Sequence, residues 1–266
     1  MILDIQDLRV SFKHENGRQT DVVHGMNVQL HKGETLGIVG ESGSGKSVMS
    51  LATMGLLPKT AQVTGKILFN GDNLLEMTEH QLCRIRGSKI GMIFQEPMTA
   101  LNPAMKVGAQ IAEGLHLHRS ISRTAANQEA LRLLDMVQIP NAGQKRFSYP
   151  HEMSGGQRQR VGIAIALALK PDLLIADEPT TALDVTVQAD ILDILDDLVS
   201  ELDISLILIS HDLGVIGRIA DHTLVMYRGN EMEQGDTERV LRHPSHDYTR
   251  KLLSAMPKRA RASLSI

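Results

Sequence analysis

The chain has 266 residues, 42% of them hydrophobic, and a formal net charge of −3. This length fits one large domain or a domain with an inserted subdomain, and the apolar content is ample for a core. The charge excludes a global positive field that would attract nucleic acid, and a single cysteine, Cys83, excludes an internal disulfide.

The N-terminal stretch MILDIQDLRVSFK mixes charges into its apolar residues, which argues against a signal peptide. The longest uncharged apolar run, VGIAIALAL at 161–169, is far shorter than the ~20 residues that cross a bilayer. We therefore expect a soluble protein that reaches a membrane, if at all, through a partner.

The predicted strands fall into two kinds. ILDIQDLRV and VVHGMNVQL alternate polar and apolar residues near the N-terminus, which predicts an antiparallel layer. Four short apolar runs are typical of strands buried on both faces, and with helices between them they predict a parallel sheet in an α/β fold. These runs are 34–40, 89–94, 173–177 and 205–210.

The remaining elements are helical apart from one hairpin. Residues 97–155 carry helical patterning without buried strand runs, which predicts a helical subdomain inserted in an α/β core formed by 1–96 and 156–250. An apolar stripe over 185–202 predicts an amphipathic helix, and 221–235 predicts a hairpin that turns at RGN. The basic tail, 251–266, is expected to fray, with a membrane-surface contact as the weaker alternative.

A glycine-rich stretch, GESGSGKS at 40–47, follows a predicted strand and precedes a helical pattern. It matches G-x-x-x-x-G-K-[ST], in which glycines let the backbone fold tightly and point several N–H groups at a phosphate. Lys46 should reach the β- and γ-phosphates, and Ser47 should bind Mg²⁺. A plain strand-to-helix turn would not explain the lysine and serine. The predicted nucleotide-binding residues of this stretch are Gly40, Glu41, Ser42, Gly43, Ser44, Gly45, Lys46 and Ser47.

Two carboxylates end the predicted strand 173–177, in the sequence LLIADEP. Asp177 is placed to help hold Mg²⁺. Because the strand ends at this point and Pro179 follows, Glu178 can face the γ-phosphate and accept a proton from the attacking water. The alternative, a solvated loop acid, is weakened by the phosphate-binding stretch in the same chain.

Two further polar residues follow buried strands. His211 comes after 205–210, at the carboxyl edge of the sheet where ligands bind in α/β folds, and could contact the γ-phosphate or orient the water. Gln95 follows 89–94 and could contact Mg²⁺ or the water. A structural histidine and a plain strand-end glutamine are the alternatives.

The sequence MSGGQ contains a second candidate for anion binding. Ser154 and Gln157 have the spacing of a capping box, which by itself marks only a helix start. A capping box does not need Gly155 and Gly156, which weaken a helix, so we interpret them as allowing an anion to approach the backbone.

These motifs, in this order along the chain, resemble the nucleotide-binding subunit of an ABC transporter. The resemblance implies a P-loop NTPase core of the RecA-like kind, and ATP and Mg²⁺ as ligands. It implies that two subunits pack head to tail, so that Ser154–Gln157 of one faces the ATP held by the other. It also places Asp184, within Ala182–Leu183–Asp184, at the dimer interface and Phe12 where an aromatic residue stacks on adenine; Phe12 on an amphipathic strand is otherwise a core residue.

FQEPMTALNP at 94–103 and HPSHDYTRKLLSAMP at 243–257 resemble the subfamily that powers uptake of oligopeptides, dipeptides or nickel in bacteria. This implies a transport-coupled ATPase at the cytoplasmic face of the inner membrane. Its implied partners are a second, identical or paralogous ATPase subunit, two membrane permeases and a periplasmic or extracellular solute-binding protein. An iron–sulfur cluster, present in some members, is not expected here because Cys83 stands alone.

Nothing in the sequence selects the solute, and His116, His118, His243 and His246 are interpreted as surface residues rather than nickel ligands. Two rival functions stay open at this stage. One is a non-transport ABC ATPase that acts on DNA or ribosomes, although this chain lacks the long coiled coil or tandem domain of such relatives. The other is a P-loop kinase in which SGGQ only caps a helix.

Overall fold

The computed structural model describes residues 1–95, 100–181 and 183–256. The chain forms two compact units. One consists of Met1–Cys83 and the chain from Ser205 onward, and the other is Arg84–Ile204. We describe each unit separately.

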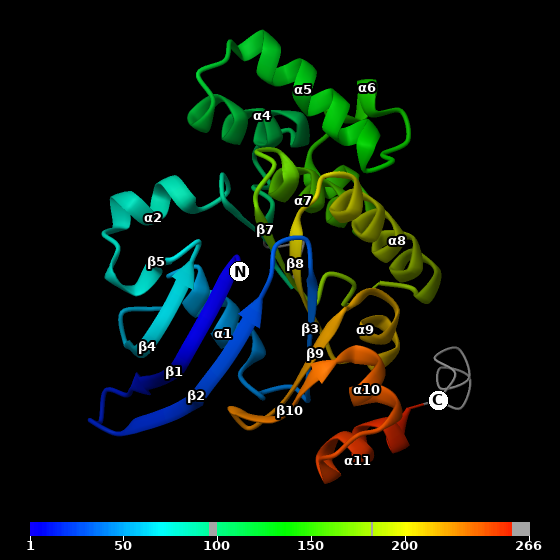
Figure 1. Ribbon diagram of the computed structural model, residues 1–266. Coiled ribbons are helices and arrows are strands. Elements are labelled where there is room, and N and C mark those ends of the chain that lie inside the picture. The colour runs from blue at the N-terminus through cyan, green and yellow to red at the C-terminus, as the bar shows by residue number, and fades with distance from the viewer. Residues whose placement is uncertain (96–99, 182, 257–266) are drawn as a thin grey trace. The chain divides into compact units, whose positions relative to one another are not determined.

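The first unit contains the predicted antiparallel layer, in which the strands run β2-β1-β4-β5 (Figure 1). Its strands are β1 (Leu3–Lys13), β2 (Gln19–Leu30), β4 (Ala61–Phe69) and β5 (Asp72–Asn73). Alternate apolar residues of β1 and β2 are buried, as the pattern predicted. β4 was not predicted, because most of its first six residues are exposed and it shows no alternation of apolar side chains.

The same unit holds the strands β10-β9-β3-β8 in that order. β3 (Thr35–Val39) pairs in parallel with β8 (Ser205–Ser210) and with β9 (His222–Tyr227), which confirms the parallel prediction. β10 (Asn230–Asp236) returns antiparallel to β9. The predicted hairpin turn lies at Arg228 and Gly229, whose φ angles of 47° and 78° fit a type I′ turn.

The helices of this unit connect its strands or follow the last of them. They are α1 (Lys46–Thr53), η1 (Leu74–Glu76), α9 (Leu213–Ile219), α10 (Thr237–Arg242) and α11 (Asp247–Ala255), with α2 (Glu79–Ile85) leading into the second unit. Figure 1 shows α10 and α11 beside the β9–β10 hairpin. Cys83 is exposed on α2.

The second unit contains a parallel strand pair and a set of helices. They are β6 (Ile90–Ile93), β7 (Leu173–Asp177), α4 (Val107–His118), α5 (Arg123–Met136), α6 (Ala142–Lys145), η2 (Pro150–Glu152), α7 (Gly155–Leu167) and α8 (Val185–Glu201). The described part of the predicted subdomain is helical. The first residues of that subdomain, 97–99, lie outside the described residues, as do Ala182 and the end of the tail, 257–266. The limits of the predicted domains stay a prediction.

Two helices of this unit follow their sequence patterns closely. α8 begins at Val185 as predicted and ends at Glu201, one residue before the predicted end, and Ile191, Ile194 and Leu198 of its stripe are buried. In the described chain, no residue of α7 is exposed, although its first half carries the polar residues Gln157, Arg158, Gln159 and Arg160. Among the described helices, none combines the length and apolar character that a membrane span requires.

Candidate functional site

The phosphate-binding stretch connects β3 to α1, as predicted. α1 begins after Gly45, whose φ of 97° lies in the left-handed region, and Gly43 has a φ of 78°. Residues with a side chain rarely adopt these φ angles, so glycine is needed at both positions. In the described structure, no side chain caps α1 at Gly45, and the N-terminus of a helix favours a bound anion.

Lys46 lies inside this loop rather than in solvent. Only 5% of the residue is exposed, and its Nζ donates to the carbonyl oxygens of Gly40 at 2.7 Å and Glu41 at 2.9 Å. Its distance to Ser44 Oγ is 3.3 Å. The ammonium group is therefore held where a phosphate bound to the loop would meet it.

The turn of the β9–β10 hairpin holds the loop from outside. Gly229 N donates to the Ser44 carbonyl oxygen at 2.9 Å. A Cβ atom on Gly40 would lie 2.2 Å from the Met226 carbonyl oxygen, which leaves no room for a side chain. Gly40 is thus required by a close backbone approach and not by its own φ angle.

In the second unit, Glu178 directly follows β7 and has an unusual backbone conformation. Its φ is 46°, in the left-handed region that costs a non-glycine residue of order 1–3 kcal/mol. Its carboxylate accepts hydrogen bonds from Thr181 Oγ1 at 2.9 Å and from Gln95 Nε2 at 3.3 Å. The backbone strain and these two donors fix the direction of a half-buried carboxylate, as a general base requires.

The structure thus brings together Gln95 and Glu178, which are 83 residues apart in the sequence. Asp177, beside Glu178, is 5% exposed at the end of the strand. Thr181 was missed by the sequence analysis. A hydroxyl residue three positions after the glutamate, in a turn, was the available signal.

The predicted capping box is confirmed. Ser154 Oγ accepts from Gln157 N at 3.3 Å, and Gln157 Oε1 accepts from Ser154 N at 3.2 Å. The two glycines also have a packing reason that the sequence did not reveal. A Cβ on Gly156 would lie 2.7 Å from Cγ1 of Val187, and one on Gly155 would lie 3.2 Å from Leu183.

The other predicted residues lie on separate elements. His211 is exposed directly after β8. Phe12 is half-buried in β1, paired with Thr20 and Ala61. Asp184 is exposed at the start of α8 and makes no side-chain cap in the described structure.

Of the histidines taken as surface residues, only His246 differs. It is half-buried and its Nδ1 accepts from Tyr248 N at 3.1 Å, which caps α11. His116, His118 and His243 are exposed. Within residues 1–95, 100–181 and 183–256, there is no group of three or more His, Cys, Asp or Glu residues suited to a metal ion.

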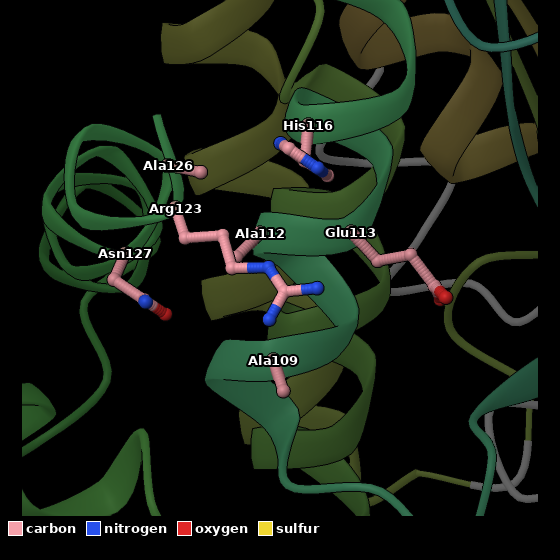
Figure 2. Close-up of a pocket in the computed structure, with 7 residues that line it drawn as sticks. All are labelled: Ala109, Ala112, Glu113, His116, Arg123, Ala126 and Asn127. Carbon is pink, nitrogen blue, oxygen red and sulfur yellow. The ribbon is translucent and has the colours of Figure 1, made fainter. Parts of the chain in front are cut away.

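A pocket of about 270 Å³ lies between α4 and α5, outside these motifs. Figure 2 shows Arg123 extending from α5 toward α4, which contributes Ala109, Ala112, Glu113 and His116 to the lining. Because none of its lining residues belongs to the predicted nucleotide site, we do not assign it to nucleotide binding.

The fold and the phosphate loop define a P-loop NTPase. The ABC transporter family model matches residues 23–181. The oligopeptide transport ATP-binding protein OppD of Bacillus subtilis (strain 168) is 51% identical over 96% of this chain and 72% of its own length. The dipeptide transport ATP-binding protein DppD of the same organism is 49% identical over 97% of this chain and 77% of its own length.

Among solved structures, the dimeric post-hydrolysis state of the ATP-binding cassette MJ0796 bound to ADP and Pi superposes with a TM-score of 0.79 at 26% identity. The superposition covers 89% of this chain and 99% of the cassette. The chain therefore belongs to the ABC transporter family, and it is an ABC-type ATPase.

Proposed function

We propose that this protein is the ATP-hydrolysing subunit of a bacterial importer of oligopeptides or dipeptides. The observation that carries the proposal is the identity of about half of its residues with OppD and DppD over nearly the whole chain. Nickel uptake is the alternative solute within the same subfamily. The names of these relatives favour neither a P-loop kinase nor an ATPase that acts on DNA or ribosomes.

We propose that the predicted site residues bind ATP and hydrolyse it. Lys46 binds the β- and γ-phosphates, and Glu178, aimed by Gln95 and Thr181, accepts a proton from the attacking water. His211 contacts the γ-phosphate or orients the water, and Phe12 stacks on adenine.

The proposed metal is Mg²⁺. Ser47, Gln95 and Asp177 offer a hydroxyl, an amide and a carboxylate oxygen, which are the hard ligands that Mg²⁺ prefers. When bound, the ion would neutralise charge on the phosphates.

We further propose a head-to-tail dimer with an identical or paralogous subunit, which the dimeric cassette supports by analogy. In this arrangement Ser154–Gln157 and Asp184 face the nucleotide held by the partner. Two membrane permeases would follow the opening and closing of the dimer through the helical segment. This places the subunit on the cytoplasmic face of the inner membrane, with a solute-binding protein on the other side.

The variant Glu178→Gln tests the chemical step. Because the amide cannot accept the proton, the assembled transporter should bind ATP and remain closed while turnover falls to near zero. Glu201→Gln, an exposed residue at the end of α8, is the matched control and should keep wild-type turnover. Normal hydrolysis by Glu178→Gln would refute the role given to this carboxylate.

Uptake of a labelled dipeptide and of Ni²⁺ in cells lacking the subunit tests the solute. Loss of peptide uptake, restored by the wild-type chain, is the expected result. Loss of Ni²⁺ uptake with peptide uptake intact would favour the alternative.

A further inference from the structure

Glu233 is a buried carboxylate in the first unit that none of the nucleotide motifs uses. Its side chain is 2% exposed in β10. Oε1 accepts from Ser245 N at 2.8 Å and Ser245 Oγ at 2.7 Å, and Oε2 accepts from His246 N at 3.2 Å. Burial by itself would raise the pKa of this carboxyl, but these hydrogen bonds outweigh it and lower the pKa to about 2.

These bonds fix the point at which α11 begins. Glu233 holds the backbone of Ser245 and His246, and His246 in turn caps the helix through Tyr248 N. Arg250 ties the same loop by donating to the Pro244 carbonyl oxygen at 2.8 Å. The start of α11 is therefore held against the hairpin by one buried carboxylate together with these local hydrogen bonds.

Tyr248, on the first turn of α11, points back toward the phosphate loop. Its ring lies 4.4 Å from the ring of Tyr227, centroid to centroid. Tyr248 and Tyr227 line a cavity of about 610 Å³ with Glu41, the second residue of the phosphate loop. Burial raises the pKa of the Tyr248 phenol. After burial, the backbone and carboxylate of Glu41 have the largest influence on this pKa.

Tyr227 joins this contact to the loop by a second route. It lies between Met226, whose carbonyl oxygen closely approaches Gly40, and the turn at Gly229, whose N–H binds the Ser44 carbonyl oxygen. A shift of Tyr227 would therefore move Met226 and Gly229, and with them the backbone of the phosphate loop.

We propose that α11 supports the phosphate loop, with Tyr248 and Glu233 as positioning residues for ATP binding. Tyr248 acts through its ring on Tyr227 and Glu41, and Glu233 acts by holding the start of α11. We assign this role to the ring of Tyr248, which contacts Tyr227, and not to its hydroxyl, which makes no hydrogen bond of good geometry among the described residues although Glu41 lies near enough to influence its pKa.

The test measures the dissociation constant of ATP for the full chain, and kcat in the assembled transporter. Tyr248→Ala should weaken ATP binding about two- to tenfold, the usual worth of an aromatic pair, and leave kcat at saturating ATP within about twofold. Tyr248→Phe should bind ATP as the wild type does. Ser254→Ala, an exposed position on the same helix, is the control and should change neither value.

Glu233→Gln should weaken ATP binding as Tyr248→Ala does, because the amide brings its own N–H donors against those of Ser245 and His246. Since both residues act through one contact, the double variant should bind no more weakly than Tyr248→Ala alone. Thermal unfolding without nucleotide shows whether each variant is folded. The proposal is overturned if folded Tyr248→Ala binds ATP normally, if Tyr248→Phe is as weak as Tyr248→Ala, or if the effects of Glu233→Gln and Tyr248→Ala simply add. The binding readout is independent of which solute is transported.

Discussion

The two glycine-containing helix starts, at 40–47 before α1 and at 154–157 before α7, resemble each other in sequence but are built differently. In the first, Gly43 and Gly45 have positive φ angles, and the helix lacks a side-chain cap in the described structure. In the second, the serine caps the helix and neither glycine has a positive φ. Glycine there leaves room for α8 and the segment before it.

This difference teaches that a glycine can be required by its own backbone or by its neighbours, and that the two requirements respond differently to substitution. A backbone requirement cannot be relieved from outside. A packing requirement can be relieved by shortening the neighbour.

Gly40, unlike Gly43 and Gly45, is required by a neighbouring backbone oxygen, which no side-chain substitution can shorten, so Gly40→Ala should have the largest effect. The new Cβ would meet the Met226 carbonyl oxygen at 2.2 Å, so the loop or the hairpin must move. Since a displacement of ~1 Å can cost ~100-fold in rate, ATPase activity of the assembled transporter should fall by about that factor. ATP titration and turnover measure this. Activity within about twofold of wild type would show that the loop tolerates the shift.

Gly156→Ala should affect the second helix start less. Its Cβ would press on Val187, which costs ~1–3 kcal/mol of overpacking, offset by ~1 kcal/mol of better helix propensity. The free energy of unfolding in urea should fall by about 1 kcal/mol, and ATP binding at the phosphate loop should be unchanged.

Combining Gly156→Ala with Val187→Ala sharpens the comparison. In the double variant, the free energy of unfolding should regain what the overpacking removed, because the methyl groups of Val187 that contact the new Cβ are absent. If the double variant has low ATPase activity although its stability recovers, Gly156 is also needed for the approach of a ligand or partner. Recovery of both would leave packing as the only reason for this glycine.

Gly162→Ala should have the smallest effect and the opposite sign. This glycine lies within α7 with no positive φ, and no described atom outside its chain neighbours and the nearby backbone of its own helix lies within 4 Å of the position of its Cβ. Alanine should raise the free energy of unfolding by about 0.4–1 kcal/mol, and urea unfolding measures it. A destabilised variant would indicate a close contact that the described residues do not show.

The parts that sequence predicted well are those with local causes. β3 and β8 are buried along their whole length and were predicted from apolar runs, and the capping box at 154–157 is fixed by residues three apart. β4 was missed because its exposed first half carries no alternation. His246 was taken as a surface residue because its partner is a backbone amide two residues away, which no composition pattern marks.

By itself, the sequence predicted the phosphate loop, the paired carboxylates and the buried strands β3, β6, β7 and β8, because each depends on neighbouring residues and a local pattern. Only the tertiary structure decided that Gln95 and Thr181 aim Glu178, that Met226 requires Gly40 and that Glu233 holds α11. These are hydrogen bonds and close approaches that form only once the chain has folded. Several join residues far apart in the chain, and none leaves a periodic signal in the sequence.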